Sequence, residues 1–250
     1  MDRLIYTAMT GASQALEQQA VTANNLANAS TTGFKAQLAA FRQVPMSFEN
    51  QSADGSTRTF VLSSTPNADY SPGPITQTGN PLDVAVQRRG WLAVQKPDGG
   101  EAYTRAGNLH VDANGQVVTA NNLPVLGNSG PLFIPPGAVP TIGSDGTISA
   151  LLPGDPPTAI AVVDQLKLVN PDSSTMVRGD DGLYHTADGD PADADPSVVV
   201  AGGALEGSNV NPVSAMVSMI DNARQFQMQT KLMESADQNE QSANKLLNFS

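Results

Sequence analysis

Long helices are expected at both ends of the chain, because the residues that interrupt helices are concentrated between them. From Asp2 to Asn28 there is no Pro and a single Gly. After Pro212, neither Gly nor Pro occurs as far as Leu247. The middle holds most of the 22 Gly and 18 Pro, together with short runs of alternating apolar and polar residues. This sequence predicts an α+β chain that runs helix, connector, β-rich body, helix.

The apolar residues of the two terminal helices recur at helical spacing, so they line one side of each helix. In the first helix these residues are Ile5, Met9, Ala12, Leu16, Ala20, Ala23 and Ala27. In the second helix they are Val213, Met216, Ile220, Ala223, Thr230, Met233, Ala236, Ala243 and Leu247. The first helix should be roughly 25 residues long, with Gly33 as a left-handed stop after it. Because most of these side chains are small, neither helix is expected to be stable alone in water.

The simplest arrangement joins both helices in one discontinuous, coiled-coil-like domain of residues 1–35 and 208–250. Residues 36–79 are polar and rich in Ser and Thr. We expect them to form an extended connector, partly β, with one hairpin near 57–63. Residues 80–207 are expected to form a mainly β body. Asn114-Gly115, between two short apolar runs, predicts a hairpin turn with both residues at positive φ, and Asp145-Gly146 repeats the signal.

Composition excludes several classes of partner. The formal charge of −11 provides no basic surface for nucleic acid. The chain has no cysteine, so neither a disulfide nor a thiolate zinc site can form. No run approaches the ~18 apolar residues that cross a membrane, and membrane insertion is not expected. The N-terminus lacks the basic and apolar regions of a cleavable signal peptide, which fits a cytoplasmic chain or export by a route that reads no ordinary leader.

No catalytic, cofactor-binding or metal-binding residues are predicted. The two histidines, His110 and His185, each lie in or beside a strand near a turn, where a structural role is expected. Phosphate-binding loops, nucleophile elbows and zinc-protease motifs do not occur. Four aspartates lie between 188 and 195, but an EF-hand loop counted from Asp188 would place Ala192 and Val199 at ligand positions. We therefore interpret this stretch as a solvated acidic loop.

Two other classes of protein remain as alternatives. A secreted β-rich hydrolase acting on peptidoglycan would need convergent carboxylates or a metal, and the sequence selects no such pair. A cytoplasmic coiled-coil adaptor would need charged residues flanking the apolar seam, and this pattern is missing.

The most specific segment is Asn-Asn-Leu-Ala-Asn at 24–28 followed by Thr-Thr-Gly-Phe-Lys at 31–35. Asparagine amides at a helix end can cap carbonyls and bridge chains. The segment resembles the N-terminal motif that flagellar rod and hook proteins share. Gly-Asn-Pro-Leu-Asp-Val-Ala-Val at 79–86, Gly-Trp-Leu-Ala-Val at 90–94, Tyr-Thr-Arg-Ala-Gly-Asn-Leu at 103–109 and the run from 205 to 220 also resemble this family. Trp91 and Pro212 depart from its usual residues.

The resemblance implies a structural subunit of the bacterial flagellar basal-body rod, and the opening residues and length resemble a proximal-rod member. A distal-rod or hook subunit of the same family is the alternative. The family implies helical self-assembly with other rod subunits and its own copies, transmission of motor torque, and export by the flagellar type III apparatus into the periplasmic rod without a cleaved leader. The implied assembly motif is Asn24, Asn25, Leu26, Asn28, Gly33 and Phe34. The implied assembly helices use Ile5, Ala12, Leu16, Met216, Ile220 and Ala223.

Overall fold

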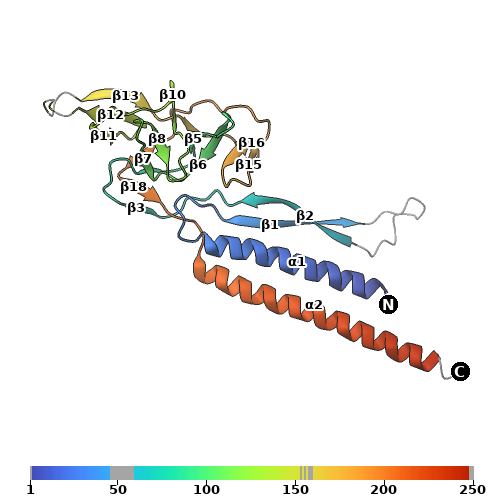
Figure 1. Cartoon of the computed structure of the whole chain (residues 1–250). Helices are drawn as coiled ribbons and strands as arrows, with labels where there is room; N and C mark the ends of the chain where they lie inside the picture. The colour runs from blue at the N-terminus through green and yellow to red at the C-terminus, as the bar shows by residue number, and fades with distance from the viewer. Residues whose placement is uncertain (1, 46–58, 153, 155, 157–159, 248–250) are drawn as a thin grey trace. The chain divides into compact units, whose positions relative to one another are not determined.

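The computed structural model describes residues 2–45, 59–152, 154, 156 and 160–247. It confirms the α+β class, with a helix at each end of the chain and a mainly β region between them (Figure 1). The chain divides into two compact units. The helical unit comprises Met1–Ala27, Gln37–Asp69 and Val210–Ser250, and the β unit comprises Asn28–Ala36 and Tyr70–Asn209.

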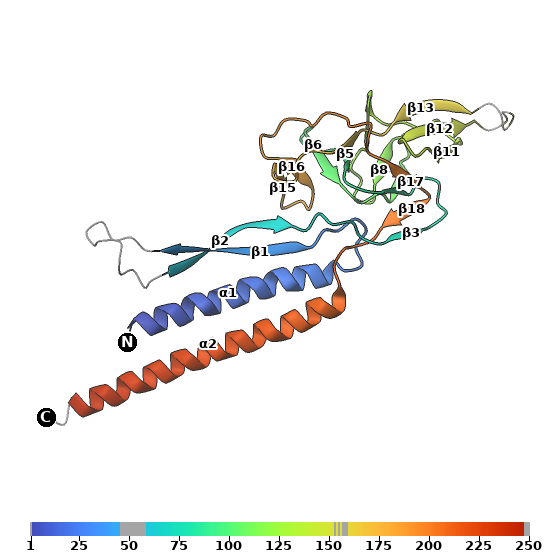
Figure 2. The ribbon, with the colours of Figure 1, turned by 180° about the vertical axis from the view of Figure 1, so that it is seen from behind.

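The helical unit is built on α1 (Asp2–Ala27) and α2 (Pro212–Leu247), which lie side by side and antiparallel (Figures 1 and 2). Gly11 of α1 lies opposite Gln229, and the Asn222 amide of α2 donates to the Thr22 hydroxyl at 3.4 Å. The side chain of Asn211 accepts hydrogen bonds from the first N–H groups of α2, at 3.0 and 3.1 Å, so it is the N-cap of this helix.

The predicted connector contains a long two-stranded sheet. β1 (Gln37–Pro45) pairs antiparallel with β2 (Thr59–Ala68), and both strands contact α1. This contact explains why residues 37–69 belong to the helical unit. Of the hairpin expected near 57–63, residues 59–63 lie in β2, and residues 57 and 58 lie outside the described residues.

The β unit consists of short antiparallel strands around one core. A five-stranded sheet has the order β14-β5-β6-β16-β15, a three-stranded sheet has the order β11-β12-β13, and the other strands form pairs. The strands are β3 (Ile75–Gln77), β4 (Val84–Val86), β5 (Trp91–Gln95), β6 (Glu101–Thr104), β7 (Leu109–Val111), β8 (Val117–Thr119), β9 (Leu126–Gly127), β10 (Gly130–Pro131), β11 (Val139–Ile142), β12 (Thr147–Leu151), β13 (Ala161–Gln165), β14 (Leu168–Val169), β15 (Met176–Arg178), β16 (Tyr184–Thr186), β17 (Val200–Gly202) and β18 (Ala204–Glu206).

The core of the β unit is aliphatic. Its most deeply buried members include Val84, Leu92, Val94, Val117, Val125, Leu132, Ile148 and Leu166. These residues lie in or next to strands spread over some eighty positions of the chain, so the short strands are held by their shared core rather than by long hydrogen-bonded ladders.

The hairpin between β7 and β8 forms as predicted, but its turn differs. The Gly115 N–H donates to the Asp112 carbonyl at 3.1 Å, and the Asp112 carboxylate accepts the N–H groups of Asn114 and Gln116 at 2.8 Å each. Gly115 has φ 84°, whereas Asn114 does not have positive φ. The prediction that both residues take positive φ is therefore wrong, because the turn is longer than two residues and requires only its glycine in the left-handed region.

Candidate assembly surface and motif segment

Helix α1 carries two adjacent rows of residues, each at alternating spacings of three and four. The inner row, which is buried or half-buried, is Ile5, Ala8, Ala12, Ala15, Gln19, Thr22 and Leu26. The outer row, which is exposed throughout, is Tyr6, Met9, Ser13, Leu16, Ala20, Ala23 and Ala27. The inner row holds the three buried alanines of α1, Ala8, Ala12 and Ala15, whose small side chains allow α2 to approach closely. The outer row has no such cover in the single chain.

Helix α2 divides in the same way. Its buried or half-buried row is Ala215, Met219, Asn222, Phe226, Gln229, Met233 and Ala236. Next to it, at the N-terminal end of the helix, four apolar side chains are between 53% and 69% exposed, and we call them the α2 outer cluster: Val213, Met216, Val217 and Ile220. Their spacing of three, four and seven residues places them on one face.

The structure therefore separates the six helix residues predicted for assembly. Ile5 and Ala12 lie in the inner row and face the partner helix of the same chain. Leu16, Met216 and Ile220 are more than half exposed. Ala223 is half-buried.

The asparagine part of the motif lies at the end of α1. The Asn25 side chain pairs with both backbone groups of Gln37: its amide donates to the carbonyl at 2.9 Å, and its oxygen accepts the N–H at 2.8 Å. This pair fixes the first residue of β1 against α1. Asn28 accepts a hydrogen bond from the Thr31 hydroxyl at 3.2 Å, whereas Asn24 is exposed and Leu26 is half-buried.

Gly33 and Phe34 fix the segment that follows α1 within the β unit. Gly33 has φ 68°, and its N–H donates to the Glu206 carbonyl at 2.8 Å. A Cβ at this position would lie 2.2 Å from the carbonyl carbon of Arg105, so only glycine fits. Phe34 is buried, and the guanidinium of Arg178 lies over its ring at 4.8 Å.

The next residue, Lys35, belongs to a buried ion triad that the sequence analysis did not identify. Its Nζ lies 2.7 Å from Oε1 of Glu206, and Nη1 of Arg105 lies 2.7 Å from Oε2. The three side chains are 0–2% exposed. Glu206 also accepts the Gly73 N–H at 2.8 Å, and Lys35 donates to the Ser71 carbonyl. Two cations share one carboxylate, so the triad carries a net positive charge away from solvent.

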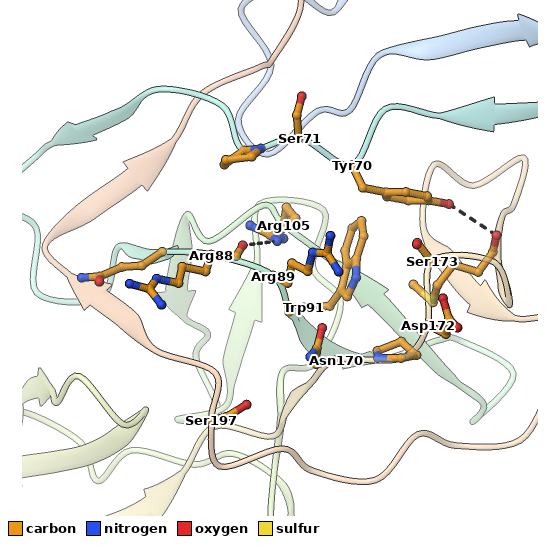
Figure 3. Close-up of a pocket in the computed structure, with 15 residues that line it drawn as sticks. Tyr70, Ser71, Arg88, Arg89, Trp91, Arg105, Asn170, Asp172, Ser173 and Ser197 are labelled. Atoms are coloured by element: carbon orange, nitrogen blue, oxygen red, sulfur yellow. Dashed lines mark hydrogen bonds between the residues drawn. The ribbon is translucent and has the colours of Figure 1, made fainter.

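A cavity of about 1030 Å³ lies beside the triad in the β unit (Figure 3). Arg88, Arg89, Arg105 and Trp91 line it, together with Asn170 and other polar residues. Trp91 packs against the Tyr184 ring, with centroids 4.4 Å apart, and Arg105 lies over its indole at 5.3 Å. Burial raises the pKa of Tyr184 to about 12, so this phenol stays neutral at physiological pH.

The histidines and the aspartates of 188–195, for which no catalytic or metal-binding role is predicted, are not among the residues that line this cavity. His110 is exposed in β7, and His185 lies 3.5 Å from Asp181. Between 188 and 195 the aspartates are mostly exposed, and within the described part of the chain no three His, Cys, Asp or Glu side chains gather as a metal site. A search of the described residues for a helix able to cross a membrane finds none.

The chain has a helix at each end, a β body between them and a buried Gly33-Phe34-Lys35 segment after α1. It belongs to the flagellar basal-body rod protein family and is a structural subunit of the rod. Residues 5–35 match the family model "Flagella basal body rod protein", residues 85–150 match "Flagellar hook protein FlgE/F/G D1 domain", and residues 201–246 match "Flagellar basal body rod FlgEFG protein C-terminal". Membership in this family confirms the resemblance noted in the sequence and the expectation that the chain is a structural protein and not an enzyme.

Individual relatives agree with these matches. The basal-body rod protein FlgF of Salmonella typhimurium is 53% identical over 259 residues, and that of Escherichia coli is 52% identical over 256 residues; each match covers 100% of both chains. The rod protein FlgG of Buchnera aphidicola is 33% identical over 237 residues, covering 87% of this chain and 89% of its own.

Proposed function

We propose that this rod subunit assembles with its neighbours through the outer row of α1 and the α2 outer cluster. The observation that supports the proposal is the exposure of large apolar side chains on both helices, beside rows that are already covered within the chain. Tyr6, Met9 and Leu16 of α1 are 52–62% exposed. Large apolar side chains that lie together in water on a helix surface indicate a surface that a partner covers.

The burial available at these surfaces favours assembly when a subunit contacts more than one neighbour. Completing the burial of one half-exposed side chain of this size stabilises by roughly 1 kcal/mol. The seven side chains of the two outer surfaces would together contribute roughly 5–7 kcal/mol, from which the cost of association must be subtracted. A contact of this size is weak alone and becomes stable when each subunit meets several neighbours.

The proposal includes the finer points that family membership suggests. The subunit leaves the cytoplasm through the flagellar type III export apparatus without a cleaved leader, takes its place in the periplasmic rod, and transmits motor torque. The alanine-rich packing between α1 and α2 supports export, because a pair that buries little large apolar surface unfolds easily. The motif segment supports torque transmission, because Gly33, Phe34 and Lys35 hold the chain after α1 firmly within the β unit.

The test is Ile220→Asp in cells that make this chain as their sole copy. A carboxylate in a seam buried between subunits costs several kcal/mol, and the penalty recurs at each such contact. We expect loss of motility and loss of the subunit from purified basal bodies. The β unit of the variant chain should stay folded. The matched control is Gln225→Asp, which places the same charge at an exposed position of α2 outside the outer cluster and should swim normally. Normal rods in the Ile220→Asp cells would refute the proposed surface.

A further inference from the structure

The cavity in the β unit is electropositive, although the chain as a whole is strongly acidic. Arg88 and Arg89 are exposed at its lining, and Arg105 adds the net positive charge of the buried triad. Asp172 also lines the cavity and offsets one of these charges, so the lining stays net positive. Figure 3 shows Arg89 and Arg105 next to Trp91, and Arg88 with its guanidinium directed away from the indole along the same lining. Among the residues that the structure describes, neither Arg88 nor Arg89 has a carboxylate within salt-bridge distance. The Nε of Arg105 also lacks a hydrogen-bond partner there. A site of this kind attracts an anion.

The chain also carries an acidic segment for which neither the fold nor the proposed function accounts. Residues 180–195 contain six aspartates and no Lys or Arg. Asp188, Asp190 and Asp193 are exposed and, among the described residues, form no salt bridge. The loop is held in shape by its own contacts, because the Ala192 N–H donates to the Tyr103 hydroxyl at 2.7 Å and the Thr186 hydroxyl donates to the Asp190 carbonyl at 2.7 Å.

We propose that the cavity around Arg88, Arg89 and Trp91 receives the exposed part of this acidic segment, residues 188–193, from a second copy of this chain. The proposal rests on the proposed function, since it requires neighbouring copies. Complementary charge identifies the occupant: the segment is the densest acidic stretch of the sequence, and the cavity is an unpaired basic site on the same unit. Each copy thus gives its segment to one neighbour and receives that of another, as a heterologous contact requires.

The chemistry of the contact follows from its groups. Arginine binds a carboxylate through two parallel N–H donors, which fixes orientation as well as attraction. The chain's own Asp195 does not fill this role, because its carboxylate accepts the Ser197 N–H at 2.8 Å and the Asn170 amide at 3.3 Å. Hydrogen bonds from the Ser197 side chain, then from the Ser197 N–H and from Asn170, lower the pKa of Asp195 and hold its carboxylate against two residues that line the cavity. The contact therefore positions the β units of neighbouring copies, whereas the helices supply most of the buried area.

The test is a charge-swap cycle on the full-length chain, with self-association measured by sedimentation at low salt. Arg89→Glu and Asp190→Arg should each weaken association about tenfold, and the double variant should return to within about threefold of the original chain. Raising the salt should reduce the difference between the single variants and the original chain. Lys96→Glu, a reversal in a turn away from the cavity, is the control and should have little effect.

The outcomes separate this contact from the helix surface. Independent effects of the two reversals, with no recovery in the double variant, would overturn the proposal. A small anion such as citrate can also be added while Trp91 fluorescence is followed. If citrate quenches this fluorescence but the two reversals are not coupled, the cavity binds anions without receiving the segment, and the proposal is overturned as well. Ile220→Asp should weaken association as well, and neither charge change should rescue it. If Ile220→Asp acts and the swap shows no coupling, only the cavity contact fails. If the swap couples and Ile220→Asp has no effect, the helix surface fails instead.

Discussion

Removing the negative charge of Glu206 should destabilise the β unit more than removing either of its partners. In Glu206→Gln the side chain keeps its size, but Lys35 and Arg105 remain as two buried cations without a counterion. Their side chains are 0% and 2% exposed, so water cannot compensate. Breaking a buried pair in this way costs about 3–5 kcal/mol. That is a large part of the 5–15 kcal/mol by which domains are typically stable.

Lys35→Met provides the contrast. It leaves Glu206 and Arg105 as a neutral pair and removes a like charge from the site. The remaining cost is the lost hydrogen bond to the Ser71 carbonyl and the loss of one charge-assisted bond to Glu206, about 1–3 kcal/mol. The same change of charge in a less buried pair, Glu101→Gln opposite Lys167, should cost less than either change in the triad, because these side chains are 11% and 19% exposed and one cation rather than two is left without its carboxylate.

Urea unfolding followed by Trp91 fluorescence measures all three variants. Trp91 is the single tryptophan, and it lies 5.3 Å from the Arg105 guanidinium, so its emission reports on the unit that contains the triad. The expected order of destabilisation is Glu206→Gln, then Lys35→Met, then Glu101→Gln. Equal costs for the first two variants, or a larger cost for Lys35→Met, would refute the reasoning that an unbalanced positive charge dominates this site.

Three further predictions follow from local structure. Gly33→Ala should lower the thermal midpoint strongly, because the new methyl group meets the Arg105 backbone at a left-handed φ; an unchanged midpoint would contradict this. Asn211→Ala should cost about 1 kcal/mol of α2 stability, visible as lost helical circular dichroism. Hydrogen bonds from Thr147 hold the pKa of the Asp145 carboxyl below its usual range. The ionised carboxylate therefore stabilises the folded chain above about pH 4, and this contribution is lost as the pH falls through the lowered pKa. Asp145→Asn should make the free energy of unfolding less dependent on pH on the acid side.

The terminal helices could be predicted from the sequence because their signals are local. Long stretches almost free of Gly and Pro predict both helices, Pro212 marks the start of α2, and the expected helix of roughly 25 residues corresponds to α1 at Asp2–Ala27. Which face of α1 packs against α2 could not be predicted in the same way. The inner and outer rows of α1 are offset by one residue and both contain apolar side chains, so periodicity alone cannot tell which row α2 covers.

The ion triad could not be predicted for a different reason. Lys35 and Glu206 are 171 residues apart in sequence, and charged side chains are expected at the surface unless a partner is known. The resemblance singled out the motif that ends in Lys35, but nothing in the sequence linked it with Arg105. Likewise, the aspartates near 190 and the adjacent arginines at 88 and 89 are ordinary surface residues until the cavity shows where the arginines lie.

The most direct test of the central claim measures whether the outer surfaces of the helices become covered in the rod. Since the chain has no cysteine, Leu16→Cys and Ile220→Cys each introduce a unique thiol. Both should react rapidly with a maleimide in the free subunit, where these positions are 52% and 53% exposed, and slowly in purified basal bodies. Asp98→Cys, in an exposed turn of the β unit, controls for access of the reagent. Equal labelling of Ile220→Cys in free subunits and in basal bodies would show that the helices do not form the assembly surface.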